Sequence, residues 1–356
     1  METILYVGGF ELPDRNAAAQ RVVGIAKGAA ALGHEVIFMN YSACSEGCCW
    51  TEYFGFPCYE QPPKSLVKSL TDITDVQKIL KEKHITAVIA YNYPAYALSL
   101  LIRYCRREGI RCYADATEWY MPRGNPLFLL VKTLDTEWRM RVLHKKMDGV
   151  LAISDYLYEY YRKVVRTVKI PPTVDMEEAK WLAEKKSADK TTFVYAGSPS
   201  SQKERLDLVV DSMERICKIR PVQLKLVGIT KAQYEKMYRT CYRGSAAFFC
   251  GRISHQEAIN TVKEADWSII FRDNNKVVKA GFPTKVVESI ACGTPVIANR
   301  FSNIDNFLKD DNSILCDPDK MEEAILYACD TRKNVDTSIF DYHLYLQEIE
   351  RLLKKV

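Results

Sequence analysis

The sequence lacks the features of a secreted or membrane-spanning protein. Its first residues, Met1-Glu-Thr-Ile-Leu-Tyr-Val, predict a strand and contain no basic leader with a long apolar run behind it. The apolar run Leu127–Val131 is much too short to span a bilayer. Low-complexity tracts are absent, and 47% of the residues are hydrophobic against 27% charged. We therefore expect a cytoplasmic globular protein, with any membrane contact being peripheral.

The sequence also lacks a recognisable metal-binding pattern. Histidine is scarce, with 5 residues, and the spacing of Cys44, Cys48, Cys49 and Cys58 is not that of paired C-x-x-C knuckles. Other members of the 12 cysteines sit inside apolar runs, and no secretion signal accompanies them. We expect reduced thiols, a structural loop around Cys44–Cys58 and no bound metal.

A chain of 356 residues is long enough for two hydrophobic cores. In the first half, strands predicted at Thr3–Gly8, Glu35–Asn40, Ala87–Tyr91, Arg111–Ala114 and Gly149–Ile153 alternate with helices at Ala17–Leu32, Ala95–Arg107 and Lys132–Met147. After the proline-stiffened stretch at Ile170 the pattern restarts, with strands predicted at Thr192–Ala196, Gln223–Val227, Ala246–Cys250, Trp267–Phe271 and Pro295–Ala298.

This alternation predicts an α/β protein of two Rossmann-like domains, each with a doubly wound parallel sheet. We expect the domains to cover residues 1–170 and 171–339, with a last helix at 340–356 that packs back on the first domain. Because open α/β sheets bind ligands at the carboxyl ends of their strands, the expected site is a cleft faced by both domains.

Positive charge is concentrated in the first domain. The formal net charge of the chain is +5, and between Arg103 and Lys146 ten Lys or Arg face five Asp or Glu. The apolar run that begins at Pro126 leads into this basic stretch, a mixture that suits an interfacial helix on an anionic membrane. A solvated helix face explains the charge equally well. No nucleic-acid-binding module surrounds it, so we expect no nucleic-acid partner.

The most informative segment runs from Ala280 to Ile297 and begins A-G-F-P-T-K-V-V-E. Gly281 permits close backbone approach, Pro283 fixes a turn, and Thr284 is expected to cap a helix that begins near Lys285. A helix N-terminus beside a lysine attracts phosphate, because free amides, the helix dipole and the ammonium act together. Glu288, one turn further on, can accept hydrogen bonds from a ribose diol.

This segment resembles the nucleotide-sugar motif of the retaining glycosyltransferases of family 4 (group 1), which have the GT-B fold. It is similar to the members that read A-G-F-P-T-K-x-x-E; many others carry a Glu where this chain has Ala280. The likeness covers most of the chain and is strongest from about Tyr195 to Ile297. It implies that Lys285 binds the donor phosphates and that Glu288 binds the ribose.

The resemblance implies further donor-binding positions in the second half. The loop after Tyr195 would supply Lys203 to the diphosphate, with Ser198 where the family commonly has Arg, and Arg205 as a replacement for that Arg. Backbone groups at Gly228, Arg252 and Ile253 would lie at the nucleoside, while His255 belongs to a helix start. The remaining expected contacts are Arg272, at a strand end, and the turn Gly281, Phe282, Pro283 and Thr284.

In the first half, the resemblance implies that Gly8 and Gly9 approach the donor diphosphate after the first strand. They do not form a complete G-x-G-x-x-G pattern, which argues against a tightly held dinucleotide. Asp115 and Glu118 are the carboxylates expected on the acceptor side. We count them with Lys285 and Glu288 as the candidate catalytic residues.

The implied activity is transfer of a glycosyl group, with retention, from a nucleotide sugar to a saccharide or a lipid-linked saccharide, as in bacterial surface-polysaccharide synthesis. A UDP-sugar is the favoured donor. Lys203, Lys285 and the amides near Gly281 would stabilise the leaving diphosphate, so no metal or other cofactor is expected. Two alternatives stay open: a nucleotide-sugar 2-epimerase of the same fold, and a non-catalytic nucleotide-binding partner subunit.

Overall fold

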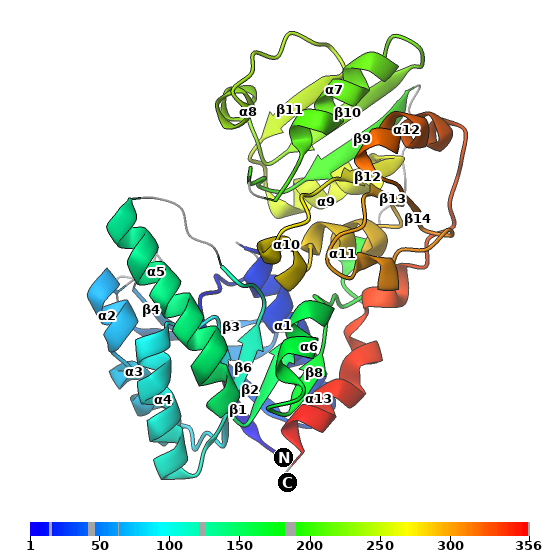
Figure 1. Cartoon of the computed structure of the whole chain (residues 1–356). Coiled ribbons are helices and arrows are strands. Elements are labelled where there is room, and N and C mark those ends of the chain that lie inside the picture. Colours follow the sequence, from blue (N-terminus) through cyan, green and yellow to red (C-terminus); the bar gives the residue numbers. More distant parts are fainter. Residues whose placement is uncertain are drawn as a thin grey trace. The chain divides into compact units, whose positions relative to one another are not determined.

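In the computed structural model the chain forms two α/β units (Figure 1). The N-terminal unit comprises Met1–Thr173 and Tyr342–Val356, and the C-terminal unit comprises Val174–Asp341. The structure describes residues 1–13, 16–41, 47–62, 64–120, 125–181, 190–201 and 203–354. Cys44 in the cysteine-rich segment, Arg123 in the basic stretch and the last two residues of the expected final helix lie outside these ranges.

The N-terminal unit is built on a sheet with the strand order β3-β4-β2-β1-β5-β6-β7-β8, in which only β3 is antiparallel to its neighbour among the described strands. Its strands are β1 (Thr3–Gly8), β2 (Glu35–Tyr41), β3 (Cys49–Tyr53), β4 (Phe56–Gln61), β5 (Ala87–Tyr91), β6 (Arg111–Ala116), β7 (Gly149–Ala152) and β8 (Thr167–Lys169). Its helices are α1 (Ala17–Ala31), α2 (Leu66–Thr71), α3 (Thr74–Glu82), α4 (Ala95–Glu108), α5 (Pro126–Trp138), α6 (Asp155–Tyr161) and α13 (Leu346–Leu353).

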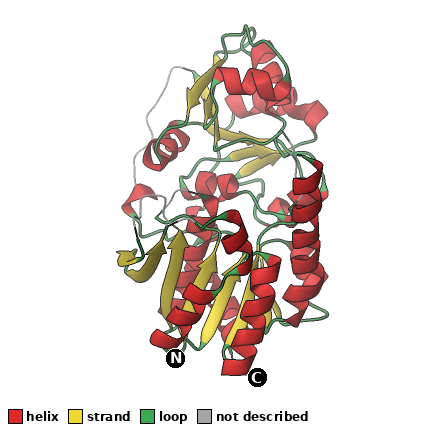
Figure 2. Ribbon diagram, turned by 90° about the vertical axis from the view of Figure 1, so that its left-hand side faces the viewer, coloured by secondary structure: helices red, strands yellow, loops and turns green. Residues whose placement is uncertain are grey.

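The C-terminal unit contains a second, fully parallel sheet with the order β11-β10-β9-β12-β13-β14. Its strands are β9 (Thr191–Ala196), β10 (Val222–Val227), β11 (Ala247–Gly251), β12 (Trp267–Ile270), β13 (Val296–Ala298) and β14 (Ser313–Leu315). Its helices are α7 (Leu206–Ile216), α8 (Lys231–Tyr238), α9 (His255–Glu264), α10 (Lys276–Ala280), α11 (Thr284–Ala291) and α12 (Met321–Cys329). The strands of both sheets lie among helices in Figure 2, as in doubly wound folds.

Two local expectations from the sequence are wrong. Cys49 and Cys58 do not lie in a loop but in the paired strands β3 and β4. The turn between these strands is made by Phe54 and Gly55, both with positive φ (55° and 80°), a backbone shape that suits a tight hairpin.

The helix expected at Lys132–Met147 begins earlier, at Pro126, because the Asn125 side chain caps it. It then continues through a π turn, Arg139–Leu143, into the 3₁₀ turn His144–Lys146.

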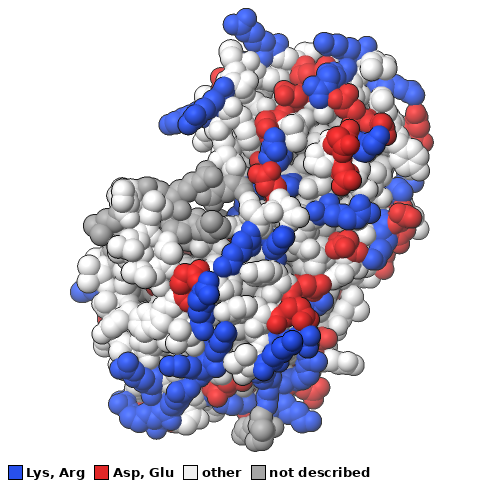
Figure 3. Space-filling view, viewed as in Figure 1, with Lys and Arg blue, Asp and Glu red and all other residues white. Residues whose placement is uncertain are grey.

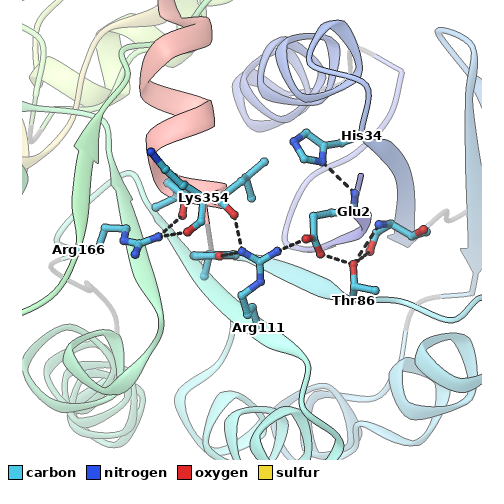
Figure 4. A network of polar contacts seen from close by, with 10 residues as sticks. Glu2, His34, Thr86, Arg111, Arg166 and Lys354 are labelled. Carbon is cyan, nitrogen blue, oxygen red and sulfur yellow. Dashed lines mark hydrogen bonds and ion pairs between the residues drawn. The ribbon is translucent and has the colours of Figure 1, made fainter. Parts of the chain in front are cut away.

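The last helix, α13, packs in the N-terminal unit. Its buried residues Ile349 and Leu352 belong to the same hydrophobic cluster as the apolar residues of β1 and α1. Arg111 and Arg166 donate hydrogen bonds to the last carbonyl groups of α13, at Leu353, Leu352 and Lys354 (Figure 4). Arg111 is itself paired with Glu2. These arginines satisfy carbonyl groups that a helix C-terminus leaves without partners, and their charge favours the negative end of the helix dipole.

Candidate functional site

The expected donor residues of the C-terminal unit gather at the carboxyl ends of its parallel strands. Glu204 follows β9, Arg272 follows β12, and Lys285 lies in the first turn of α11. An antiparallel bridge between Glu204 and Arg272 joins the two loops. Because ligands of open α/β sheets bind at this edge, these side chains stand where the fold places a binding site.

The centre of this arrangement is Glu204, which sequence reasoning did not select. Its side chain is 2% exposed, and its Oε1 lies 2.8 Å from Arg272 Nη2 and 3.5 Å from Lys285 Nζ. The backbone N–H of Ser200 donates to Glu204 Oε2 at 2.7 Å. Burial by itself raises the pKa of Glu204, but Lys285, Arg272 and the Ser200 N–H outweigh it, so that the pKa is lowered. Glu204 is therefore held as a carboxylate. We name Glu204, Arg272 and Lys285 the Glu204 cluster.

Lys285 is enclosed by protein on several sides. Its ammonium lies 5.1 Å from the centre of the Tyr195 ring, and its side chain is 14% exposed. Burial, together with repulsion from Arg272, lowers the pKa of Lys285 in spite of the opposing charges of Glu204 and Glu288. A Cβ atom at Gly197 would come within 2.7 Å of Lys285 Cε, and Gly197 has a φ of 126°, so this position requires glycine.

Arg272 is held by two backbone hydrogen bonds to Asn299 and by contact of its guanidinium with the Phe301 ring. Its N–H donates to Asn299 Oδ1 and its carbonyl accepts from Asn299 Nδ2, at 2.9 and 2.8 Å. The guanidinium lies 5.3 Å from the centre of the Phe301 ring. With two cations and one carboxylate, the Glu204 cluster carries a net positive charge inside a largely dehydrated region. Such a place favours an anion.

Glu288 lies one turn after Lys285 on α11 and contacts a residue that sequence reasoning assigned only to a helix start. His255 is the first residue of α9, as expected, but its Nε2 also lies 3.2 Å from Glu288 Oε1. Within the described part of the chain, Glu288 Oε2 accepts no hydrogen bond. The contact thus orients the carboxylate and leaves an acceptor atom for another partner.

The turn before α11 differs from expectation at Thr284 and at Phe282. Thr284 is the first helical residue and not the cap; Pro283 occupies the cap position, where no side chain satisfies the first amides. Gly281 has a φ of −94°, which any residue adopts, and its carbonyl accepts from Ser302. Phe282 is buried and packs edge-on against Phe307 and Phe340. It therefore anchors the turn in the core, where a donor-binding role was expected.

Two other expected donor residues, Lys203 and Arg205, lie between β9 and α7. Arg205 is already neutralised, because it pairs with Asp207 at 2.9 Å and with Asp273 at 3.5 Å. Lys203 is tied through its backbone to Ser200 and Asp273, and its side chain is partly exposed.

The glycine loops after β9 and β10 meet backbone to backbone. A Cβ at Gly228, where φ is 94°, would lie 2.6 Å from the Gly197 carbonyl and 3.0 Å from Ser198 N. Ile253 packs on a small apolar cluster beside this contact, while Arg252 is exposed.

In the N-terminal unit, the structure places Asp115 in the interior and not on an accessible surface as expected. Asp115 is fully buried; Arg21 Nη2 lies 2.7 Å from its Oδ1, and the Tyr6 hydroxyl donates to its Oδ2 at 2.5 Å. Because both oxygens are occupied by buried partners, this carboxylate has a structural role. Glu118 is partly exposed beyond the end of β6. Gly8 is required, because a Cβ there would lie 2.1 Å from Tyr91 O, whereas space around Gly9 is open.

The chain is similar to one protein family and to several solved structures. The sequence model of the family described as "Glycosyl transferases group 1" matches residues 190–331, which contain the Glu204 cluster and Glu288. Sucrose-phosphate synthase from Thermosynechococcus elongatus superposes with a TM-score of 0.73 at 15% identity, over 99% of this chain and 98% of that one. HepE from Anabaena, in complex with UDP and glucose, gives a TM-score of 0.68 at 14% identity, over 99% of each chain.

The fold is GT-B. A glycosyltransferase from Rickettsia africae shares it, with a TM-score of 0.69 at 14% identity over 100% of this chain and 99% of that one. No curated protein sequence matches the chain. In this GT-B chain, the part that the family model matches is also the part that contains the Glu204 cluster.

Two other kinds of feature are absent from the residues that the structure describes. Among the described residues, no group of three or more His, Cys, Asp or Glu side chains is arranged to hold a metal ion. In the same residues, no helix is both long and apolar enough to cross a membrane.

Proposed function

We propose that this protein is a glycosyltransferase that moves a sugar from a nucleotide-sugar donor, with a UDP-sugar favoured, to a saccharide or lipid-linked saccharide. The observation that carries the proposal is the net positive Glu204 cluster next to the uncapped start of α11. In glycosyl transfer the bond between the sugar and the diphosphate breaks, and negative charge develops on the leaving phosphate oxygen. Buried cations and free amides stabilise that charge.

The position of Glu288 supports a nucleoside diphosphate over a simple phosphate ester. A ligand whose phosphates lie at Lys285 can extend its ribose along α11, where Glu288 Oε2 is available as an acceptor. The solved complexes of HepE with UDP and with UDP-glucose support uridine as the base. We propose retention of the anomeric configuration and a cytoplasmic location. Because two side-chain cations are already in place, we also propose that transfer does not require a metal ion.

Nucleotide binding tests the donor site. We expect UDP to raise the thermal unfolding temperature more than GDP, ADP or dTDP, with the same shift in EDTA. Lys285→Ala and Glu288→Gln should each remove most of the shift. Lys218→Ala and Glu323→Gln, which change exposed residues of the same unit, should leave it intact. Equal shifts in the two pairs of variants would contradict the assignment of the site.

Product analysis tests the reaction. With a UDP-sugar and a saccharide or lipid-linked saccharide acceptor, we expect a new glycosidic bond whose anomeric configuration, read by NMR, equals that of the donor. Formation of a nucleotide sugar inverted at C2, without any acceptor, would show that the protein is an epimerase and not a transferase. UDP binding without turnover, combined with restored turnover of a partner enzyme, would replace it by a nucleotide-binding partner subunit.

A further inference from the structure

Helix α5 and the π turn Arg139–Leu143 that follows it expose several large apolar side chains to solvent. These are Leu130, Val131, Leu134 and Trp138 of α5 and Val142 of the π turn, which we name the outer stripe. Leu134 is 60% exposed and Leu130 58% exposed, far more than residues that support a core. Each isolated apolar residue on a surface is unremarkable, but a contiguous row of them marks an interaction site.

The outer stripe lies on the side of α5 that faces away from the protein. At about 100° per residue, Leu130, Val131, Leu134 and Trp138 fall on one side of α5, opposite the buried Thr136. Arg139 and Met140, the first residues of the π turn, are buried as well. On that inner side, the Asp135 carboxylate accepts from the Ala95 N–H and Arg139 donates to the Asn92 carbonyl, which attaches α5 to the start of α4. The helix is therefore held rigidly from one side and presents apolar side chains on the other.

Basic residues adjoin the stripe. Arg106 at the end of α4 donates to the carbonyl of Lys146, which brings the two basic ends of α4 and of the α5 extension together. Lys146 is exposed, Lys132 is partly exposed, and Lys145 lies 4.5 Å from the centre of the Tyr160 ring. In Figure 3 uncharged atoms predominate over α5, and Lys and Arg gather at the lower end of the same unit. Two acids of this region, Glu108 and Glu137, pair with Arg107 and Arg141.

We propose that the outer stripe of α5 is a docking surface for an anionic lipid bilayer, with α5 lying in the plane of the interface. A row of Leu and Val with a Trp suits the boundary between head groups and acyl chains. The basic residues at its end complement the negative charge of the lipid phosphates. A bilayer, unlike a protein pocket, has no shape to match and so accepts a smooth helix side of this kind. The surface would place the enzyme where lipid-linked saccharides reside.

Flotation of the full-length protein with vesicles tests this surface without any donor or acceptor, so its outcome is separate from that of nucleotide binding. We expect the protein to float with phosphatidylcholine vesicles that contain phosphatidylglycerol, and to bind about tenfold less to phosphatidylcholine alone or at high salt. Leu134→Glu should lower the partition coefficient on the order of tenfold or more, because it removes an apolar side chain that the bilayer would bury and adds a charge of the same sign as the lipid phosphates. Protein that stays at the bottom of the gradient with anionic vesicles at low salt would overturn the proposal.

Ile219→Glu is the matched control, because Ile219 is 71% exposed and lies in the other unit. It should float as the wild type does, and both variants should keep the wild-type unfolding temperature. Equal flotation of Leu134→Glu and the wild type would overturn the assignment to α5. Conversion of a dimer into a monomer by Leu134→Glu, without any flotation of the wild type, would show that a second copy covers the stripe and would also overturn it.

Discussion

Replacement of Glu204 by Gln isolates the electrostatic role of the buried carboxylate. The substitution keeps the size of the side chain and an oxygen that accepts from the Ser200 N–H. It removes the charge that compensates Arg272 and Lys285, whose side chains are 8% and 14% exposed. Removing one member of a buried ion pair lowers the free energy of unfolding by about 3–5 kcal/mol. We expect about 3 kcal/mol, the lower end, because both cations keep some exposure to water.

Urea denaturation and thermal unfolding at pH 7 measure this cost. For a unit of this size, about 3 kcal/mol corresponds to a fall of about 6–12 °C in the unfolding temperature. The lowered pKa of Glu204 means that its charge stabilises the folded state above the unfolded pKa and that this stability is lost as pH falls through the folded value. The wild type and Glu204→Gln should therefore converge in stability as the pH falls below about 4.3.

The same variant should bind UDP more tightly, although it is less stable. In the wild type the carboxylate of Glu204 competes with a diphosphate for Lys285 and Arg272. Because a charge-assisted hydrogen bond contributes about 1.5–3 kcal/mol, loss of the competitor should lower the Kd for UDP by about tenfold or more. Calorimetric titration measures it, with Glu323→Gln as a neutral control. Wild-type stability and affinity in Glu204→Gln would refute the counter-ion role, and a folded variant that no longer binds UDP would show that Glu204 contacts the ligand directly.

Three further outcomes follow from single contacts. Gly197→Ala should weaken UDP binding by about tenfold or more, because its Cβ displaces the Lys285 side chain. Gly293→Ala is the control: φ is 69° there, but the nearest atom to its Cβ, Thr337 Cγ2, lies at 3.7 Å, so the change should cost about 1 kcal/mol of stability and leave titrations with UDP unchanged. His255→Ala should raise the Kd for UDP about fivefold while the Kd for pyrophosphate stays constant, because only the ribose contact is loosened; Gln256→Ala should alter neither. Burial lowers the pKa of His144 to about 3. As the pH falls, the unfolded chain therefore binds a proton at this histidine before the folded chain does, and the free energy of unfolding falls by about 2 kcal/mol between pH 6.5 and pH 5. Urea titrations should show this loss to be absent in His144→Gln.

The strands that the sequence predicted are those with a long buried apolar run. β5 and β12 read as apolar runs because both faces of a parallel sheet are covered. The strands β8 and β14 were missed, since each has three residues of which at least one is polar, whereas β13 is equally short but wholly apolar. The hairpin β3–β4 was missed for another reason: β3 is largely exposed, so its side chains show no apolar alternation.

Within the site, local motifs were predictable and long-range pairs were not. Lys285 and Glu288 share a helix turn, so their spacing in the sequence fixes their geometry. Glu204 stands between two basic residues in a segment that reads as polar surface, and its two ion-pair partners, Arg272 and Lys285, lie far along the chain. A signal did exist: Arg272, two residues after the end of the apolar strand β12, needs a buried counter-ion. The sequence does not say which acid supplies it.

The Glu204 cluster lets the protein stay folded without a ligand and still bind an anion. Two bare cations at a strand end would repel each other and resist dehydration, which the lowered pKa of Lys285 reflects. One carboxylate between them offsets most of this cost and fixes both side chains before a ligand arrives. Because it supplies only one negative charge, a net positive charge is left for a diphosphate, and the nearby Arg205 adds nothing further since Asp207 and Asp273 neutralise it. The carboxylate is thus what makes a preorganised anion site compatible with a folded protein that has no ligand bound.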